Sequence, residues 1–274
     1  MRSLKLLVVV ACVVWPAAFA IAAEEAKPGT PPWFADSFEG TSPKGWSPVW
    51  FPWGDNITTD EAGTPPDGGK HAYRQIWNEG KGWSGLDLQF AKVPGMPAKL
   101  GTGSELYLRY VLKYDPEFTY SDSTGFKQII IQSDSVVHDR LYLCLVGKDA
   151  RLGLYFQTVT GAGWMMSNVN GPAFAMPKGR WVEFEWHLKV SPESEKKGTV
   201  KGWVDGQLRW DYKDIATIQK GSYVSLSINP TFNQAIEGPK QSRYWDLFSI
   251  GPGRMGKDQE PASPAEAEQA GGRR

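Results

Sequence analysis

Histidine and cysteine are scarce in this sequence, and its charges cancel. The 274 residues include three His and two Cys, and 30 Lys and Arg against 30 Asp and Glu leave no net charge. Binding to nucleic acid needs a clear basic excess or stripe, so this balance speaks against a nucleic-acid partner. His71, His138 and His187 are isolated from one another, so the sequence spells out no local histidine-rich metal site.

Motifs for nucleotide, zinc and nucleophile-elbow chemistry are also absent. The sequence has no phosphate-binding loop, no Rossmann glycine pattern, no HExxH and no GxSxG. We therefore expect no cofactor. A structural calcium ion stays open, although no acidic cluster in the sequence demands one.

The first 23 residues have the order of a secretory signal peptide. Arg2 and Lys5 give a basic start, residues 6–23 are almost wholly apolar, and small residues close the run with A-x-A cleavage candidates. A retained membrane anchor is the alternative, because 6–23 is just long enough to span a bilayer. Pro16 and the small-residue end favour cleavage. We expect a secreted or periplasmic protein with no membrane attachment after cleavage.

The rest of the chain divides into a linker, one folded domain and a tail. Residues 24–32 are the linker, and the folded domain is expected over 33–252. Residues 253–274 contain almost no large apolar groups, so they cannot repay their ordering entropy and are predicted to be disordered. If Cys12 leaves with the signal peptide, Cys144 has no partner for an internal disulfide, and we expect a buried structural thiol.

Alternation of apolar and polar residues with period 2 recurs through the predicted domain, and helical periodicity does not. In the segment 105–113, Leu106 and Leu108 share one face while Glu105 and Arg109 share the other. The remaining strand candidates are 71–77, 84–90, 125–132, 139–146, 151–158, 181–190, 199–204, 207–212, 222–229 and 243–250.

Turn signals separate these strands. Asp205-Gly206 between two of them is typical of a two-residue type I′ hairpin, in which both central residues need positive φ. About a dozen short strands with turns at regular spacing predict an all-β fold, and we expect a two-sheet antiparallel jelly-roll sandwich.

Two consecutive segments resemble the concanavalin A-like lectin/glucanase superfamily. Residues 179–189 (GRWVEFEWHLK) resemble a strand of these sandwiches, and residues 198–206 (GTVKGWVDG) resemble the hairpin that follows it. Residues 36–39 and 244–246 add to the resemblance. Within the superfamily, the chain looks most like the heparin-lyase-type and alginate-lyase-type polysaccharide lyases. These motifs are structural, so the resemblance identifies a fold better than an activity.

A polysaccharide lyase removes the proton α to a uronate carboxylate and expels the glycosidic oxygen. It needs Arg, Gln or Asn to neutralise the carboxylate, and Tyr or His as base and acid. The resemblance implies Arg109, Gln128 and His138 as catalytic residues. Tyr223 is a further catalytic candidate, which lies near the matching place in the lyases but not at it. The residues that we expect to contact substrate are Lys127, Gln132, Tyr107, Tyr155, Trp203, Asn229 and Asn233.

The chain departs from the lyase pattern in two places. Ile130 stands where a His would complete a Gln-x-His triplet from Gln128, and residues 225–233 replace a Lys-x-Gly-x-Tyr run. Gln128 and Gln132 are still expected on one face of their strand, with Arg109 on a neighbouring strand of the same groove.

Two other functions stay open at this stage. The 13 Trp favour a non-catalytic carbohydrate-binding module, because indoles in loops can stack on sugar rings. Glu183 and Glu185 alternate on one strand and could be the carboxyl pair of a laminarinase-type glycoside hydrolase, although a solvated strand face is the plainer interpretation. All three functions share an extracellular polysaccharide as the expected partner. The Trp residues in turns or polar segments are Trp33, Trp46, Trp50, Trp53, Trp77, Trp83 and Trp164.

Overall fold

The computed structural model describes most of the predicted domain. The described residues are 30–40, 45–49, 57–58, 63–66, 68–77, 85–118, 126–135, 139–146, 151–158, 161–165, 174–228 and 241–256. The predicted signal peptide, the linker up to residue 29 and the tail from residue 257 lie outside them. Within these ranges, no helix is long and apolar enough to cross a membrane.

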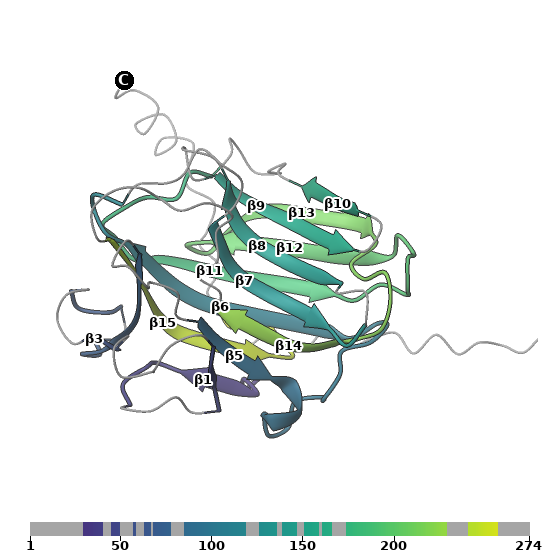
Figure 1. The fold of residues 1–274 in the computed structure, drawn as a ribbon, viewed down its shortest axis with the longest axis horizontal. Coiled ribbons are helices and arrows are strands. Elements are labelled where there is room, and N and C mark those ends of the chain that lie inside the picture. The colour runs from purple at the N-terminus through teal and green to yellow at the C-terminus, as the bar shows by residue number, and fades with distance from the viewer. Residues whose placement is uncertain are drawn as a thin grey trace, which may run out of the picture.

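The described strands form two antiparallel sheets that lie one over the other (Figure 1). The order in the eight-stranded sheet is β13 (Gln207–Ile215), β12 (Gly198–Val204), β11 (Val182–Lys189), β6 (Glu105–Tyr114), β15 (Gln241–Gly251), β4 (Ala72–Trp77) and β3 (Ile57–Thr58), with β1 (Phe34–Asp36) also paired to β15. The order in the seven-stranded sheet is β10 (Gly161–Met165), β9 (Arg151–Thr158), β8 (Arg140–Val146), β7 (Phe126–Ser133), β14 (Tyr223–Ile228), β5 (Gly85–Gln89) and β2 (Ser47–Val49). A short 3-10 turn, Phe90–Lys92, follows β5. The predicted two-sheet jelly-roll sandwich is confirmed.

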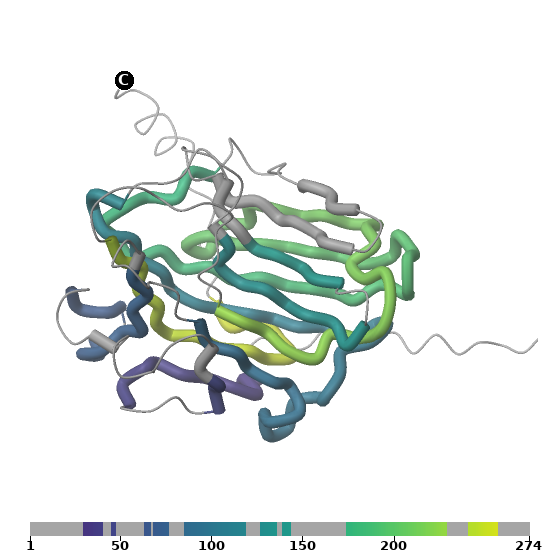
Figure 2. Tube along the Cα trace, in the orientation of Figure 1, coloured from purple at the N-terminus to yellow at the C-terminus, as the bar shows by residue number. Residues whose placement is uncertain are grey.

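Segments far apart in the chain pair at the centre of the eight-stranded sheet. The first described strand, β1, pairs with the last, β15, through Phe34 opposite Ile250 (Figure 2). β15 pairs in turn with β6, and β6 with β11. These pairings tie the N-terminal end of the domain to its C-terminal end.

The alternating apolar residues form one core between the sheets. On β6, Leu106, Leu108 and Tyr110 are almost fully buried in this core. On β7 of the seven-stranded sheet, Ile129 and Ile131 belong to the same core and face it from the opposite side. Burial of each such side chain contributes roughly 2 kcal/mol to stability, so the pattern that predicted the strands also holds the sheets together.

The predicted hairpin at Asp205-Gly206 is confirmed. It joins β12 to β13, and both residues have positive φ, 47° at Asp205 and 75° at Gly206. Earlier on β12, Gly202 leaves room for two stacked indoles, because a Cβ at this position would lie 2.6 Å from the Trp186 ring and 2.8 Å from the Trp210 ring.

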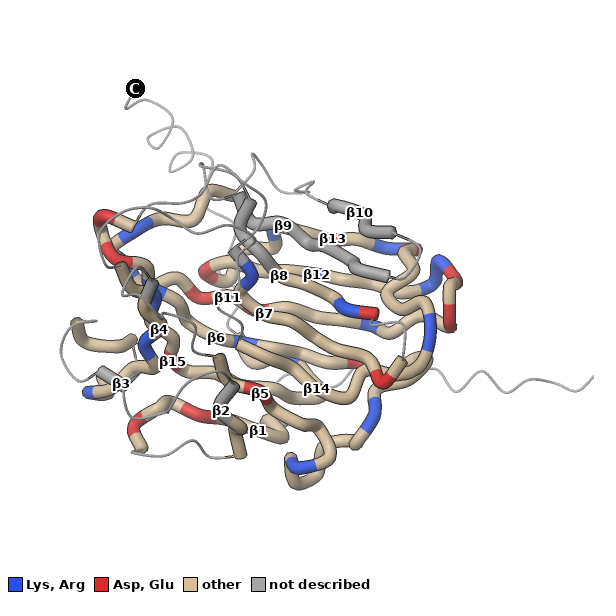
Figure 3. The backbone as a smooth tube through the Cα atoms, viewed as in Figure 1, with Lys and Arg blue, Asp and Glu red and all other residues tan. Residues whose placement is uncertain are grey.

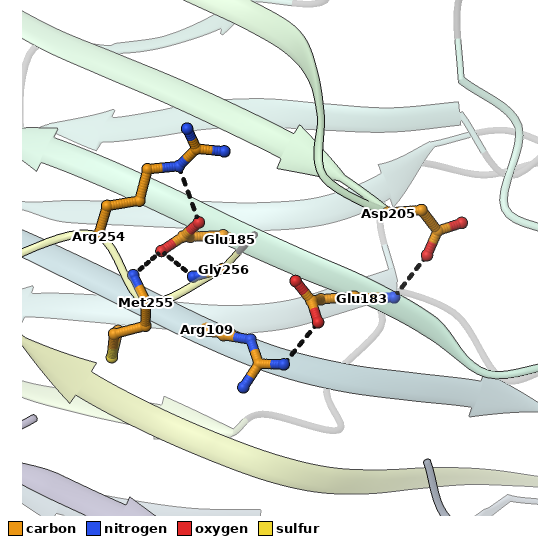
Figure 4. Close-up of polar contacts among 7 residues, drawn as sticks. All are labelled: Arg109, Glu183, Glu185, Asp205, Arg254, Met255 and Gly256. Carbon is orange, nitrogen blue, oxygen red and sulfur yellow. Dashed lines mark hydrogen bonds and ion pairs between the residues drawn. The ribbon is translucent and has the colours of Figure 1, made fainter. Parts of the chain in front are cut away.

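After β15, the chain folds back over the outer side of the eight-stranded sheet. The Glu185 carboxylate, only 2% exposed, accepts hydrogen bonds from the backbone N–H groups of Met255 (2.6 Å) and Gly256 (3.0 Å), and from Arg254 Nε (3.2 Å) (Figure 4). The boundary predicted at residue 252 therefore falls before the last residue that packs on the domain.

Candidate functional site

Arg109 and Gln128 do not share a groove, contrary to the sequence prediction. Arg109 lies on β6, on the outer side of the eight-stranded sheet, where its Nη2 donates to Glu183 Oε2 at 2.6 Å (Figure 4). Gln128 lies on β7 of the other sheet, is 0% exposed, and accepts a hydrogen bond from the Tyr110 hydroxyl at 2.9 Å. Tyr110 belongs to the core, so Gln128 points between the sheets.

A β-bulge explains the position of Gln128. The register of β7 against β8 shifts between Lys127, opposite Cys144, and Ile129, opposite Leu143. The extra residue is Gln128, and a bulge disturbs the simple alternation of faces. As a result, Gln128 lies inside the sandwich while Gln132 lies outside it.

Tyr223 is also inside the core and is not available as a base. Its ring is 1% exposed, and its hydroxyl donates to the carbonyl of Thr217. Burial raises the pKa of the Tyr223 phenol far above its usual range, which keeps the hydroxyl protonated. A register shift between Tyr223 and Ser225 on β14 breaks the simple alternation of faces along this strand, so Tyr223 and Ser225 lie on different sides of the sheet.

Two of the predicted substrate contacts lie on the eight-stranded sheet, away from Gln132. The Tyr107 ring stacks on the His187 ring at 4.5 Å between centroids. Trp203 is 9% exposed, and the Arg254 guanidinium lies 4.4 Å from its ring centroid. The Tyr107 ring and the Trp203 ring therefore each pack against another side chain of the domain.

The remaining predictions fall partly outside the described residues. His138, Asn229 and Asn233 lie outside them, as do Trp50, Trp53 and Trp83. Tyr155 lies on β9, opposite Tyr142 on β8, but its side chain is not described, and the same holds for the side chains of Cys144, Trp77 and Trp164. Trp46 is a core residue and Trp33 packs partly buried against the core.

The outer side of the seven-stranded sheet carries a set of mostly polar side chains with the apolar Ile130 among them, which we call the polar face. Cross-strand partners share a face, and the registers connect Asp87 with Ser227 and Ile130, and Gln89 with Ser225 and Gln132. The members of the polar face are Asp87, Gln89, Lys127, Ile130, Gln132, Arg140, Tyr142, Ser225 and Ser227.

A chain of hydrogen bonds crosses three strands of the polar face. Gln132 Nε2 donates to Ser227 Oγ at 3.1 Å, and Ser227 Oγ donates to Asp87 Oδ1 at 2.9 Å. Gln89 Nε2 donates to Asp87 Oδ2. Linked side chains of this kind have few rotamers left, so the hydrogen bonds fix the positions of these polar groups.

Two cations converge on Tyr142 in the same face. The Lys127 ammonium lies 4.9 Å from the centroid of the Tyr142 ring, and Arg140 Nη1 donates to the Tyr142 hydroxyl at 3.5 Å. Lys127, Arg140 and Gln132 are all partly exposed, whereas Tyr142 is 1% exposed. The polar face thus combines two cations, amide groups and a phenol on β7 and β8 with the Asp87 carboxylate on β5. Its β7–β8 side, where the cations lie, suits an anionic, hydroxyl-rich ligand.

Of these residues, the sequence analysis named Lys127 and Gln132 but missed Arg140 and Tyr142. The signal was present, because Arg140 and Tyr142 alternate with the core residues Leu141 and Leu143 in a predicted strand. What the sequence could not show was that this strand lies beside β7 and faces the same way.

The carboxylates considered for hydrolysis lie on the opposite side of the sandwich. Glu183 Oε2 accepts a hydrogen bond from Arg109, and the backbone N–H of Glu183 donates to Asp205 Oδ1 at 2.9 Å. Glu185 is buried beneath residues 254–256. A cleft of about 1000 Å³ borders Glu183 and Arg109 but does not include Glu185. The predicted hydrolase needs Glu183 and Glu185 together at the scissile bond, and of these two only Glu183 borders the cleft.

Charges of both signs are interspersed over the described chain, and the strands show no block of a single sign (Figure 3). Among the described residues, no group of three or more His, Cys, Asp or Glu side chains is placed to hold a metal ion.

No family model matches the chain, and no curated protein matches it in sequence. Solved structures do match. An endo-β-1,4-glucuronan lyase from the fungus Trichoderma reesei superposes with a TM-score of 0.51 at 13% identity, over 71% of this chain and 87% of that one. The cellulose induced protein Cip1 gives 0.53 at 16% identity, over 82% and 99%. An alginate lyase from Aplysia kurodai gives 0.55 at 10% identity, over 81% and 99%. At these identities the likeness concerns the fold alone, a two-sheet jelly-roll sandwich.

Proposed function

We propose that this protein binds a uronate-containing polysaccharide along the polar face and cleaves it by β-elimination. The observation that carries the proposal is the convergence of Lys127 and Arg140 on Tyr142, with the Gln132 amide on the same face. The cations and the amide supply the groups that recognise a carboxylate, and Tyr142 supplies a hydroxyl that can move a proton.

The elimination assigns one task to each group. Lys127 and Gln132 bind the uronate carboxylate and stabilise the negative charge that it gains when the neighbouring carbon loses its proton. Tyr142, reacting as its phenolate, takes up that proton, the carbon–carbon double bond forms, and the glycosidic carbon–oxygen bond breaks. The Tyr142 hydroxyl then gives the same proton to the departing oxygen, which leaves as a hydroxyl, and Tyr142 returns to the phenolate. Arg140 holds the Tyr142 oxygen in place throughout.

The structural neighbours support the choice of substrate class. Two proteins that share the fold are a glucuronan lyase and an alginate lyase, and both act on polymers of uronic acids. A fold supports many activities, so the proposal rests on the polar face of this chain. The predicted signal peptide of residues 1–23 agrees with an exported protein whose substrate lies outside the cell.

One observation favours a second candidate, a carbohydrate-binding module that does not cleave its ligand. Tyr142 is almost fully buried, and Ile130, apolar and 4% exposed, lies between Ser227 and Tyr142 in the register of the polar face. A binding module needs the polar side chains and the charge but no mobile proton. The two candidates share a ligand and differ in whether a product forms.

The deciding experiment uses the full-length mature protein with polyglucuronate, alginate and heparin, and with a neutral glucan as the reference polymer. Ultraviolet absorbance follows the unsaturated uronate product, and affinity electrophoresis follows binding. We expect product from at least one uronate polymer and none from the glucan. Binding without product selects the module, and neither binding nor product on any uronate polymer overturns both candidates.

A further inference from the structure

A fully buried arginine connects the two sheets directly behind the polar face. Arg243 on β15 is 0% exposed and belongs to the eight-stranded sheet. Its cross-strand partners are Gln75 on β4 and Tyr114 on β6, so the three side chains form a row on the inner side of that sheet. None of the proposed chemical steps uses Arg243.

The guanidinium of Arg243 is held in a fixed orientation. Nε and Nη2 both donate to Gln75 Oε1, at 2.9 Å and 2.5 Å, and Nη1 donates to the Tyr114 hydroxyl at 3.2 Å. Trp245 donates from Nε1 to the same Gln75 oxygen at 2.7 Å, and its ring lies 4.8 Å from the guanidinium carbon. This packing leaves the planar group little freedom to rotate.

The same guanidinium reaches across the interior to the seven-stranded sheet. Arg243 Nη1 donates to the backbone carbonyl of Lys127 at 3.2 Å. Lys127 is the residue at which the β7 bulge begins, and Gln128, the extra residue, accepts from Tyr110 at 2.9 Å. Both hydrogen bonds come from the eight-stranded sheet, so the bulge is held from the inside at two adjacent residues.

Burying a guanidinium costs free energy of desolvation, and replacing buried charged residues by well-packed apolar ones often causes no loss of stability. An apolar residue at 243 could fill the space but could not donate to the Lys127 carbonyl. A bulge also lacks part of the ladder that fixes an ordinary strand, so its carbonyl orientation depends on partners outside the sheet. The particular contribution of Arg243 is therefore the geometry of the bulge.

We infer that Arg243 is a positioning residue for the polar face. By holding the Lys127 carbonyl inside the sandwich, it fixes the backbone from which the Lys127 side chain extends outward to Tyr142. Substitution of Arg243 should loosen the bulge and spread the positions of the Lys127 ammonium. The inference about catalysis rests on the proposed function, whereas the inference about Lys127 geometry does not.

The first test measures the position of Lys127 without any substrate. Lysine acetylation rates are measured by mass spectrometry in the wild-type protein, Arg243→Met, Arg243→Lys and Tyr114→Phe. Tyr114→Phe is the matched control, because it removes one hydrogen bond of Arg243 and leaves the bond to Lys127. The exposed Lys99, which pairs with Asp134 at 2.7 Å, is the internal reference.

We expect the acetylation rate of Lys127, divided by that of Lys99, to change severalfold in Arg243→Met and by less in Arg243→Lys. In Tyr114→Phe this ratio should stay at the wild-type value. Circular dichroism and thermal melting establish which variants fold. If Arg243→Met does not fold, Arg243→Lys carries the test, since it keeps the charge but cannot donate in the same planar geometry. A folded variant at 243 with a wild-type Lys127 rate overturns the inference.

The second test uses the polymer that the wild-type protein binds or cleaves. Arg243→Lys should raise KM or Kd by roughly tenfold, the scale of one charge-assisted hydrogen bond, while Tyr114→Phe stays near wild type. If the wild-type protein binds no uronate polymer, the proposed function fails, and the acetylation result still decides the role of Arg243. If binding is found and Arg243→Lys leaves it unchanged, the inference fails and the proposed function stands.

Discussion

Gln128 and Gln132, four residues apart on β7, lie on opposite sides of the seven-stranded sheet. Gln132 donates to Ser227 on the polar face, and Gln128 accepts from Tyr110 in the interior. The bulge between Lys127 and Ile129 produces this arrangement. It places one amide in the core, where it links the two sheets, and a second amide on the polar face.

The two glutamines therefore predict a contrast in stability. Gln128→Ala removes a buried hydrogen bond and leaves a cavity, so we expect a loss of about 2 kcal/mol in the free energy of unfolding. Gln132→Ala on the polar face should change it by less than about 0.5 kcal/mol. Urea denaturation of both variants measures the difference, and equal losses would show that Gln128 does not connect the sheets.

Lys127 and Tyr142 should separate binding from chemistry. Lys127→Ala is expected to weaken binding of the uronate polymer by roughly tenfold or more, because a charge-assisted hydrogen bond to the carboxylate is lost. Tyr142→Phe should lower kcat by about a hundredfold or more with little change in binding, because it removes the proton-transferring hydroxyl. Lys99→Ala, a charge change elsewhere on the surface, is the control. Wild-type turnover in Tyr142→Phe would rule out its role as base.

Glu185 should anchor residues 254–256 to the sheet. Glu185→Ala leaves the N–H groups of Met255 and Gly256 without their acceptor, and we expect a loss of about 1–3 kcal/mol and faster proteolysis at the C-terminal end. Gly256→Ala should give the same proteolysis, since its Cβ would lie 2.6 Å from Glu185 Oε2.

Glu183→Gln serves as the comparison for this anchor, because Glu183 is partly exposed and binds Arg109 rather than the backbone of residues 254–256. Limited proteolysis followed by mass spectrometry locates the cleavage sites. Equal protection of the C-terminal end in Glu185→Ala and wild type would contradict the anchor.

The Glu105 carboxyl should make the free energy of unfolding depend on pH. The hydrogen bond from His187, at 2.9 Å, is the main cause that holds the pKa of the Glu105 carboxyl below its ordinary value. A carboxyl whose pKa is lower in the folded state than in the unfolded state binds fewer protons when folded. Its contribution to stability is therefore complete above the ordinary carboxyl pKa of about 4.3 and is lost as the pH falls through the lowered folded value.

We expect Glu105→Gln to reduce the slope of the unfolding free energy against pH in this acidic range. Glu195→Gln, at an exposed carboxylate that pairs with Lys197, is the matched control and should leave the slope unchanged. Urea denaturation at several pH values measures both. A Glu105→Gln slope equal to that of wild type would show that the His187 contact does not contribute.

The candidate site was predictable only in part. Lys127 and Gln132 were named because they lie in an alternating strand that resembles a lyase strand, and they do lie on the outer side of the sheet. Arg109 was expected beside them because the resembling lyases carry an Arg on a neighbouring strand, and the strand of Arg109 precedes theirs in the chain. In a sandwich, however, consecutive strands can belong to different sheets, and β6 and β7 do.

The strands, the Asp205-Gly206 hairpin and the class of fold were predictable from the chain alone, because alternation and turn chemistry are local properties. The neighbours of each strand and the positions of the register shifts became known from the folded arrangement. These features turn Gln128 and Tyr223 inward, separate Arg109 from Gln132, and bring Arg140 and Tyr142 beside Lys127. They depend on hydrogen bonds and packing between segments far apart in sequence, such as Arg243 with Lys127, which no local pattern encodes.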